Sequence, residues 1–259
     1  MAYRASSAAL SLRGLSKAFG STLAVDRLDL VVPRGSFFGF VGPNGAGKTT
    51  TLSMATGLLR PDAGTAHVLG HDVWSDTVHA KQLVGILPDG LRLFDRLTGL
   101  QLVCYCGLLR GMDRVLVAGR ARELLSALGL EQDSGTLVVD YSAGMTKKIS
   151  LACALIHAPR LLVLDEPFES VDPISSSTIR QILKGYAASG GTVILSSHVM
   201  DLVQRLCDRV AVVAAGQIRA VGTLDEVRSG MTLEERFVDL VGGRADVGEG
   251  LAWLRSSSD

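Results

Sequence analysis

The chain has 259 residues, 47% of them hydrophobic, which is enough for one large domain or two small ones around a substantial core. Its 26 Lys and Arg residues balance its 26 Asp and Glu residues, so its formal net charge is zero. This balance argues against a nucleic-acid partner, because proteins that bind nucleic acids normally meet the phosphates with an excess of basic residues.

Cysteine spacing and hydropathy indicate a reducing compartment. No two of the four cysteines have the C-x-x-C spacing of a zinc or redox site, and we interpret them as buried free thiols; they are Cys104, Cys106, Cys153 and Cys207. No uncharged run approaches the ~20 apolar residues of a membrane-spanning helix. We therefore expect the chain to reside in the cytoplasm.

The first part of the chain predicts strands followed by a helix. Strands are expected at residues 28–32 and 36–41, separated by a Pro-Arg-Gly turn at residues 33–35. A helix should begin at Lys48 and end near residues 57–61. This is a strand, loop and helix unit.

The middle of the chain is dominated by helical periodicity. It predicts a helical subdomain, at about residues 90–157, inserted into the rest of the fold. Within it, a helix over residues 115–130 should place Leu116, Leu124 and Leu128 along one side.

Strand signals return in the last part, at residues 161–164, 192–196 and 210–214, and helix-like stretches separate them. This alternation predicts an α/β fold with a mostly parallel sheet, preceded by a small antiparallel portion. The ends, residues 1–7 and 243–259, are expected to be loosely ordered.

A phosphate-binding loop is predicted between the second strand and the first helix. The pattern G-x-x-x-x-G-K-[ST] is matched at every fixed position by Gly42, Pro43, Asn44, Gly45, Ala46, Gly47, Lys48 and Thr49. A chance match is expected in roughly 1% of chains of this length. We expect Lys48 to contact the β and γ phosphates, Thr49 to supply an oxygen to Mg²⁺, and Thr50 to add a phosphate contact.

Two acids follow the apolar run at residues 161–164, at the strand end where open α/β sheets bind ligands. We expect their side chains on opposite faces, with Asp165 holding magnesium and Glu166 orienting or deprotonating the attacking water. In isolation they are equally well explained as solvated caps. Together with the phosphate loop they indicate nucleotide hydrolysis.

The order of these segments resembles the ATP-binding cassette (ABC) family, whose L-S-G-G-Q signature opens a helix before the acidic strand. The matching residues are Ser142 and Gly144, within the sequence Tyr-Ser-Ala-Gly-Met. Ser142 taken alone is explained as a helix N-cap. The resemblance implies that both residues complete the nucleotide site of an opposite subunit.

Three further residues acquire roles from this resemblance. Phe19 corresponds to the aromatic residue that stacks on adenine, Asp172 to the dimer-contact loop, and His198 to the switch histidine at the γ phosphate. Each has a simpler alternative: Phe19 in the core, Asp172 as the N-cap of a helix that starts with proline, and His198 as a structural residue.

Departures from the family pattern point to altered turnover. Asp89 stands where the family usually has a glutamine, and an acid there is expected near the magnesium or the attacking water. In the signature, Tyr141, Ala143 and Met145 replace the usual leucine, glycine and glutamine. Slow hydrolysis is one expected consequence.

The resemblance extends over residues 8–242 and implies a P-loop ATPase core with an antiparallel β subdomain and the inserted helical subdomain. It further implies a magnesium-dependent ATPase that uses ATP and Mg²⁺, pairs head to tail with a second copy, and drives a membrane permease from the inner face of the cell membrane. Two rivals stay open: a soluble ATPase of the same family, and a catalytically weak nucleotide-binding scaffold.

Residues 231–240 look like those of export-type members with separate membrane subunits. Thr232 and Glu235 form a possible capping box, and the apolar stripe, which should pack on its own domain, contains Leu233, Phe237 and Leu240.

A docking groove for a helix of the permease is expected at residues 89–110, because this segment is unusually apolar. The alternative is an ordinary buried helix. The apolar residues are Leu91, Leu93, Phe94, Leu97, Leu100, Leu102, Val103 and Tyr105.

Overall fold

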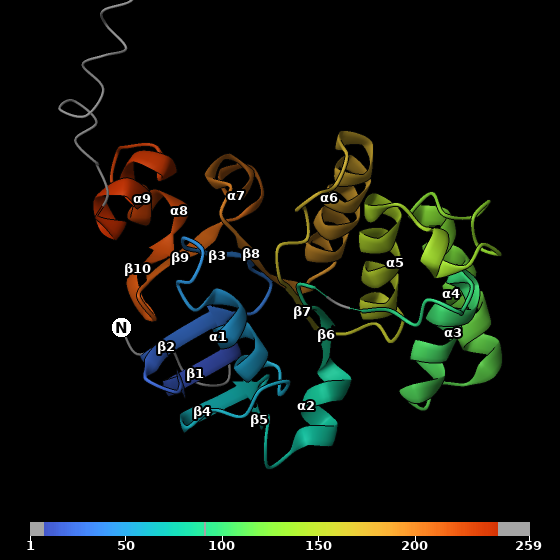
Figure 1. Cartoon of the computed structure of the whole chain (residues 1–259), viewed down its shortest axis with the longest axis horizontal. Coiled ribbons are helices and arrows are strands. Elements are labelled where there is room, and N and C mark those ends of the chain that lie inside the picture. The colour runs from blue at the N-terminus through green and yellow to red at the C-terminus, as the bar shows by residue number, and fades with distance from the viewer. Residues whose placement is uncertain (1–7, 91, 243–259) are drawn as a thin grey trace, which may run out of the picture.

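The computed structural model describes residues 8–90 and 92–242, which form two sheets with helices around them (Figure 1). The expectations for residues 1–7 and for the tail at 243–259 lie outside the described residues, as does Leu91 of the expected groove.

The larger sheet carries the candidate site. Its strand order is β10-β9-β3-β8-β7-β6, and every neighbouring pair is parallel except β10 with β9. This confirms the predicted mostly parallel α/β sheet. The strands are β3 (Phe37–Val41), β6 (Val84–Leu87), β7 (Leu161–Leu164), β8 (Thr192–Ser197), β9 (Arg209–Ala214) and β10 (Gln217–Thr223).

The smaller sheet is antiparallel, with the order β2-β1-β4-β5. Its strands are β1 (Ala8–Phe19), β2 (Thr22–Pro33), β4 (Ala63–Val68) and β5 (His71–Asp72). The expectation that this portion precedes the phosphate loop is only half right, because β4 and β5 follow the loop. The sequence of β4 hides its strand character, since only Ala66 and Val68 are buried in it.

Helix α1 (Lys48–Ala55) lies between the two sheets. Its buried residues Leu52, Met54 and Ala55 share one hydrophobic core with side chains from both sheets, including Leu12 of β1 and Phe40 of β3. Burial on both sides fixes the helix, and the helix in turn fixes the phosphate loop at its N-terminus.

The helical subdomain forms the end of the molecule away from the small sheet and contains α3 (Gly99–Leu109), α4 (Arg114–Ala127) and α5 (Ala143–Leu155) (Figure 1). The predicted helices are confirmed. Of the three leucines expected along one side of α4, Leu116 is 46% exposed, whereas Leu128 is buried and Leu124 packs against the same core. The buried face of α4 also carries Val117, Ala121 and Leu125. A Cβ on Gly107 would meet Val117 at 2.8 Å, so the small residues let α3 and α4 approach closely on this face.

Most of the remaining helices pack around the large sheet, whereas α2 also contacts β4 and β5 of the small sheet. Two of these helices confirm predicted caps. Asp172 caps α6 (Pro173–Ala188), and Thr232 with Glu235 forms the capping box of α9 (Leu233–Val241). Leu233 is fully buried and Phe237 and Leu240 pack against the core, so α9 does pack on its own domain. The others are α2 (Thr77–Leu83), α7 (Met200–Leu206) and α8 (Leu224–Arg228).

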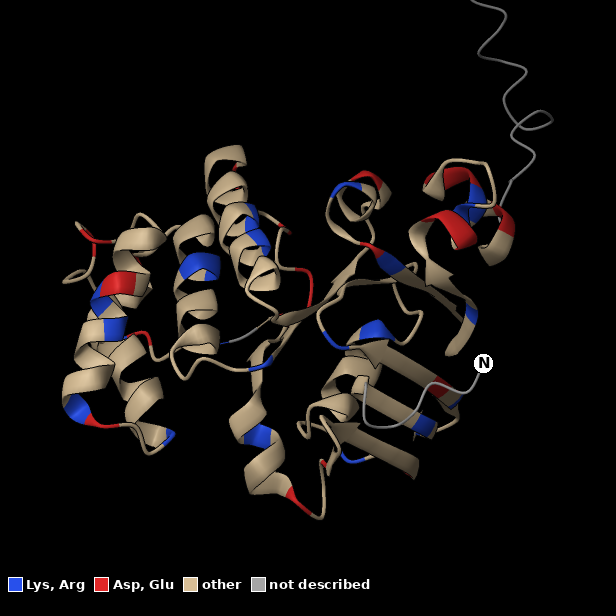
Figure 2. Ribbon diagram, turned by 180° about the vertical axis from the view of Figure 1, so that it is seen from behind, with Lys and Arg blue, Asp and Glu red and all other residues tan. Residues whose placement is uncertain are grey.

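The cysteines are free, but the expectation that all are buried is wrong. Cys207 is buried, whereas Cys104, Cys106 and Cys153 keep partial exposure on the helical subdomain. Basic and acidic residues are interspersed over the described elements (Figure 2). Within the described ranges, no helix combines the length and apolar character needed to cross a bilayer.

Candidate nucleotide-binding site

The phosphate loop joins the end of β3 to the start of α1, as its motif predicts. Two of its glycines have no room for a side chain: a Cβ on Gly42 would lie 2.4 Å from the carbonyl oxygen of Val213, and one on Gly47 equally close to that of Ala24. Gly47 also has a φ of 97°. Glycine is therefore required at both positions for the loop to keep this conformation.

Lys48 is buried against this loop, with 7% of its surface exposed. Its Nζ donates hydrogen bonds to the carbonyl oxygens of Gly42 at 2.8 Å and Pro43 at 3.3 Å. The ammonium charge is thus held inside the curve of the loop, where it can meet phosphate oxygens.

The two acids after β7 are tied to the neighbouring strand by Ser196. The Ser196 hydroxyl donates a hydrogen bond to Oδ1 of Asp165 and accepts one from the backbone N–H of Glu166 at 2.9 Å. Asp165 is 4% exposed, and Glu166 has a φ of 45° that turns the chain sharply after the strand. Ser196 was missed in the sequence, although a hydroxyl at the end of an otherwise apolar strand is a usable signal.

Glu166 is the centre of a small cluster of charged side chains. Its Oε1 lies 3.1 Å from Nδ1 of His198 and 3.6 Å from Nζ of Lys48. The Glu166 side chain is only 12% exposed, while His198 is 45% exposed at the mouth of the site. The arrangement places a carboxylate acceptor beside the phosphate loop, oriented from two sides by cationic or hydrogen-bonding partners.

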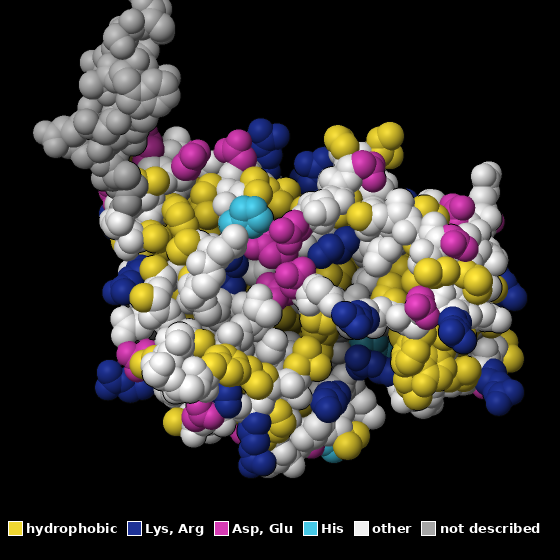
Figure 3. Space-filling model, in the orientation of Figure 1, with side chains coloured by type: hydrophobic (Ala, Val, Ile, Leu, Met, Phe, Trp, Pro, Cys, Tyr) yellow, Lys and Arg dark blue, Asp and Glu magenta, His cyan; other side chains and the backbone are white. Residues whose placement is uncertain are grey.

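These groups line a pocket of about 470 Å³. In the space-filling view, acidic side chains and a histidine meet at a hollow in the centre of this face (Figure 3). Phe19 is 51% exposed at the pocket, so the alternative that it belongs to the core is wrong. The predicted residues that line the pocket are Phe19, Pro43, Asn44, Gly45, Ala46, Gly47, Lys48, Thr49, Thr50, Asp89, Glu166 and His198.

Ser142, Gly144 and Asp172 do not line this pocket. Ser142 caps α5 by accepting a hydrogen bond from the backbone of Met145 at 3.3 Å, and it is exposed. Asp172 accepts hydrogen bonds from the backbone of Ile174 at 3.0 Å and Ser175 at 2.9 Å, so the N-cap interpretation is confirmed for both residues. Asp172 also adjoins Gly144, where a Cβ would lie 2.6 Å from its Oδ2.

Lys147 connects the helical subdomain with the acids, a link that the sequence did not reveal. Its Nζ donates a hydrogen bond to the carbonyl oxygen of Glu166 at 2.9 Å and lies 3.8 Å from Oδ1 of Asp89. The charge of Asp89 at the pocket is therefore partly balanced by a lysine of α5.

The donor chemistry beside the pocket fits Mg²⁺. Thr49 lines the pocket with a hydroxyl. Neither Gly42 nor Asp165 lines it, but Asp165 is buried and directly precedes Glu166, which does. The Thr49 hydroxyl and the Asp165 carboxylate are hard oxygen donors of the kind that this ion prefers. Asp89 adds a second carboxylate at the rim of the pocket.

A second hollow lies between the helical subdomain and α2. It measures about 580 Å³, and its lining includes Leu93, Phe94, Leu102 and Leu109 of the expected docking segment. Phe94 is 60% exposed and packs edge-on against Tyr105, whereas Leu102 and Val103 are buried. The docking segment thus contains both exposed groove residues and ordinary core residues.

Comparison with known proteins assigns the chain to a family. The family described as "ABC transporter" matches residues 25–169, which is more than half of the chain. The chain belongs to the ABC transporter family.

Relatives in this ABC family are proteins named for drug resistance and export. The chain is 38% identical over 223 residues to a daunorubicin/doxorubicin resistance ATP-binding protein of Streptomyces peucetius, covering 86% of this chain and 68% of the relative. A linearmycin resistance ATP-binding protein of Bacillus subtilis is 36% identical, with 85% and 71% covered. A Nod factor export ATP-binding protein of Burkholderia lata is 37% identical, with 83% and 71% covered.

Solved ABC structures share the fold. An ATP-binding subunit of an ABC transporter superposes with a TM-score of 0.83 at 27% identity, covering 89% of this chain and 98% of that one. A dimeric cassette bound to ADP and Pi gives a TM-score of 0.76 at 23% identity, with 83% and 98% covered.

Proposed function

We propose that this chain is the ATP-hydrolysing subunit of an export-type ABC transporter. The observation that carries this proposal is the position of the Glu166 carboxylate, which contacts His198 and Lys48 directly beside the phosphate loop. A glycine-rich turn alone binds phosphate; an oriented carboxylate next to it adds the means to activate water.

The chain's own residues divide the binding of ATP among them. Phe19, exposed at the pocket, stacks on the adenine ring. The loop's backbone N–H groups and the ammonium of Lys48 bind the phosphates, aided by the N-terminus of α1 and by Thr50. When bound, Mg²⁺ supplies positive charge that offsets the charge of the phosphate oxygens, and Thr49, Asp165 and Asp89 are the residues that would hold it.

Hydrolysis is an in-line displacement assisted by Glu166. A water oxygen bonds to the γ phosphorus while the bond from that phosphorus to the bridging oxygen breaks, leaving ADP and inorganic phosphate. Glu166 accepts the proton of the attacking water, and His198 orients Glu166 and donates a hydrogen bond to the γ phosphate.

A second copy completes the site in a head-to-tail dimer. Ser142 and Gly144 contribute the N-terminus of α5, which lies outside the chain's own phosphate pocket, and Asp172 belongs to the loop at the dimer contact. The exposed position of Ser142 supports this arrangement, because it is accessible to another molecule.

The hollow between the helical subdomain and α2 receives a helix of a membrane permease, and this contact keeps the chain at the inner face of the cell membrane. Exposed apolar side chains such as Phe94 beside a hollow are typical of helix-in-groove recognition. The relatives named for drug resistance and Nod factor export support an exporter.

The groove has a direct test by co-purification with the permease. Leu93→Asp and Phe94→Asp should abolish co-purification, because a charge in an apolar contact is costly. Val115→Asp is the matched control, since Val115 is 82% exposed on α4 and does not line the hollow. Co-purification that survives both groove variants would contradict the docking assignment.

A catalytically weak scaffold is the second candidate function, favoured by Met145 in the signature and by Asp89 at the pocket. Measuring phosphate release by the purified chain, in Mg²⁺ and in EDTA, distinguishes such a scaffold from an active ATPase. We expect release that requires Mg²⁺ and rises when membranes with the cognate permease are added. Release that no permease stimulates would favour a soluble ATPase instead.

A further inference from the structure

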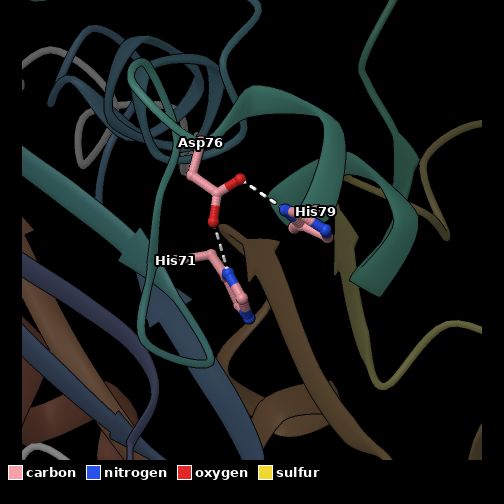
Figure 4. Close-up of side chains that lie close together, drawn as sticks. All are labelled: His71, Asp76 and His79. Atoms are coloured by element: carbon pink, nitrogen blue, oxygen red, sulfur yellow. Dashed lines mark hydrogen bonds and ion pairs between the residues drawn. The ribbon is translucent and has the colours of Figure 1, made fainter.

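A compact group of two histidines and one aspartate lies away from the nucleotide pocket, between β5 and α2 (Figure 4). His71 comes from β5, Asp76 immediately precedes α2, and His79 lies in the first turn of that helix. The side chains are 39%, 40% and 65% exposed, respectively. The group is therefore open to ions from solvent.

The Asp76 carboxylate is turned toward the imidazoles and away from the helix that it precedes. Aspartate at an N-cap normally accepts hydrogen bonds from backbone N–H groups of the first turn. Asp76 occupies the N-cap of α2 without making such a bond. Its Oδ2 instead lies 2.6 Å from Nδ1 of His71, and its Oδ1 lies 2.6 Å from Nδ1 of His79.

We propose that His71, Asp76 and His79 form a binding site for a divalent transition-metal ion of the zinc class. Their candidate donor atoms all lie within 4.8 Å of one another. Zinc bonds of about 2.0–2.1 Å in tetrahedral geometry place donors roughly 3.3 Å apart, so modest side-chain rotations close the site. Three protein donors leave the fourth position to water.

The donor set selects the class of ion. Imidazole nitrogen suits Zn²⁺, Ni²⁺ and Cu²⁺, whereas Mg²⁺ and Ca²⁺ prefer sites made of oxygen alone. In the metal-free chain each imidazole donates its Nδ1–H to the carboxylate. On binding, the Nδ1 lone pairs turn to the ion, and the proton of each neutral imidazole is carried on Nε2 instead.

The position of the site gives the ion a structural effect. It would tie the first turn of α2 to β5, and three side chains of this short helix, Val78, Lys81 and Gln82, line the hollow between the helical subdomain and α2. Metal binding should therefore slow hydrogen exchange in α2 relative to the metal-free chain.

The test is a Zn²⁺ titration of the full chain, prepared without a histidine tag and stripped with EDTA. We expect one equivalent to bind, and His79→Gln and Asp76→Asn each to weaken its affinity at least about tenfold. His67→Gln is the matched control: His67 lies 3.6 Å from Asp72 in the same sheet but outside the group, and its replacement should leave the affinity unchanged. Equal affinity in the parent, His79→Gln and Asp76→Asn would overturn the site.

Thiols are the competing ligands, because Cys106 and Cys153 of the helical subdomain line the hollow between that subdomain and α2. Binding that is lost in Cys106→Ser and kept in His79→Gln would assign the ion to the thiols and refute the proposal. Bound Co²⁺ should absorb as a nitrogen and oxygen complex without a thiolate charge-transfer band. Binding of Ca²⁺ as tight as that of Zn²⁺ would also refute it.

Discussion

Two helices of this chain begin at residues for which we propose a role in ATP binding, and their N-termini are capped differently. Helix α1 starts after Gly47, which has no side chain to cap it, and its first residues, Lys48, Thr49 and Thr50, line the phosphate pocket. Helix α5 starts after Ser142, whose hydroxyl caps the backbone of Met145, and this N-terminus lies outside the pocket.

The difference shows which parts of the site one chain can supply. The α1 end is complete within the chain: loop, Lys48, Glu166 and His198 lie together and contact one another. The α5 end is satisfied locally by the Ser142 cap, and Ser142 is exposed. In the proposed dimer this end would meet a phosphate that the second molecule presents. Binding should therefore survive changes at α5, whereas hydrolysis should not.

Glu166→Gln is expected to have the largest effect. Loss of the proton acceptor should lower the rate of phosphate release about 100-fold or more, while ATP binding persists and closed dimer accumulates. Radiometric phosphate release, ATP binding and light scattering measure these quantities. Glu123→Gln on α4, far from the pocket, is the control that should leave the rate unchanged. Normal turnover in Glu166→Gln would exclude this carboxylate as the base.

Ser142→Ala should have an intermediate effect that separates the two helix ends. The lost cap costs about 1 kcal/mol of unfolding free energy, and we expect release to fall about tenfold with ATP affinity unchanged. Thr223→Ala removes the equivalent cap from α8 and matches the stability cost. If phosphate release falls by the same factor in both variants, Ser142 acts only by stabilising its helix and not at the nucleotide site.

Protonation of His157 is expected to have the smallest effect, and it acts on stability. This residue lies at the junction between the helical subdomain and the sheet. Burial, and then the charge of Arg110, lower the pKa of His157 to about 4, while its Nε2 lies 3.1 Å from the carbonyl oxygen of Val84 in β6. Between about pH 6.5 and 4, His157 is protonated in the unfolded chain but stays neutral in the folded chain. The full difference between the two pKa values corresponds to about 3 kcal/mol, and solvent screening of this partly exposed side chain reduces it. The unfolding free energy should therefore fall by about 1–2 kcal/mol as the pH drops from about 6.5 to 4.

Denaturant unfolding of the parent and of His157→Gln across this pH range measures the contribution. The parent should lose more stability than the variant on acidification, because the variant has no imidazole to protonate. Equal losses in the two proteins would show that carboxylates alone account for the acid sensitivity.

The sequence predicted best what local pattern determines. The phosphate loop and the strands β3, β7, β8 and β9 were found because a motif or a continuous apolar run marks each of them. The strand β4 was missed because its burial depends on neighbouring strands. Of the leucines expected along one side of α4 only Leu116 is exposed, because the face that approaches Gly107 of α3 is set by Val117 and Ala121.

Within the site, the sequence predicted the residues that a motif names and missed those that only proximity identifies. Ser196 and Lys147 contact the acids from a neighbouring strand and from the helical subdomain, and neither contact is visible as a spacing along the chain. Asp172 and Ser142 have a local role as caps, which the sequence did predict.

In the proposed dimer one nucleotide site draws residues from two copies of the chain. Mixing Lys48→Ala, which lacks a working phosphate loop, with Ser142→Arg, which lacks a working signature, tests this sharing. In a purified heterodimer the intact loop of one chain faces the intact signature of the other, so we predict that Mg²⁺-dependent hydrolysis recovers to as much as about half that of the parent dimer, which has two such sites. Hydrolysis as low as that of either variant alone would contradict the shared site.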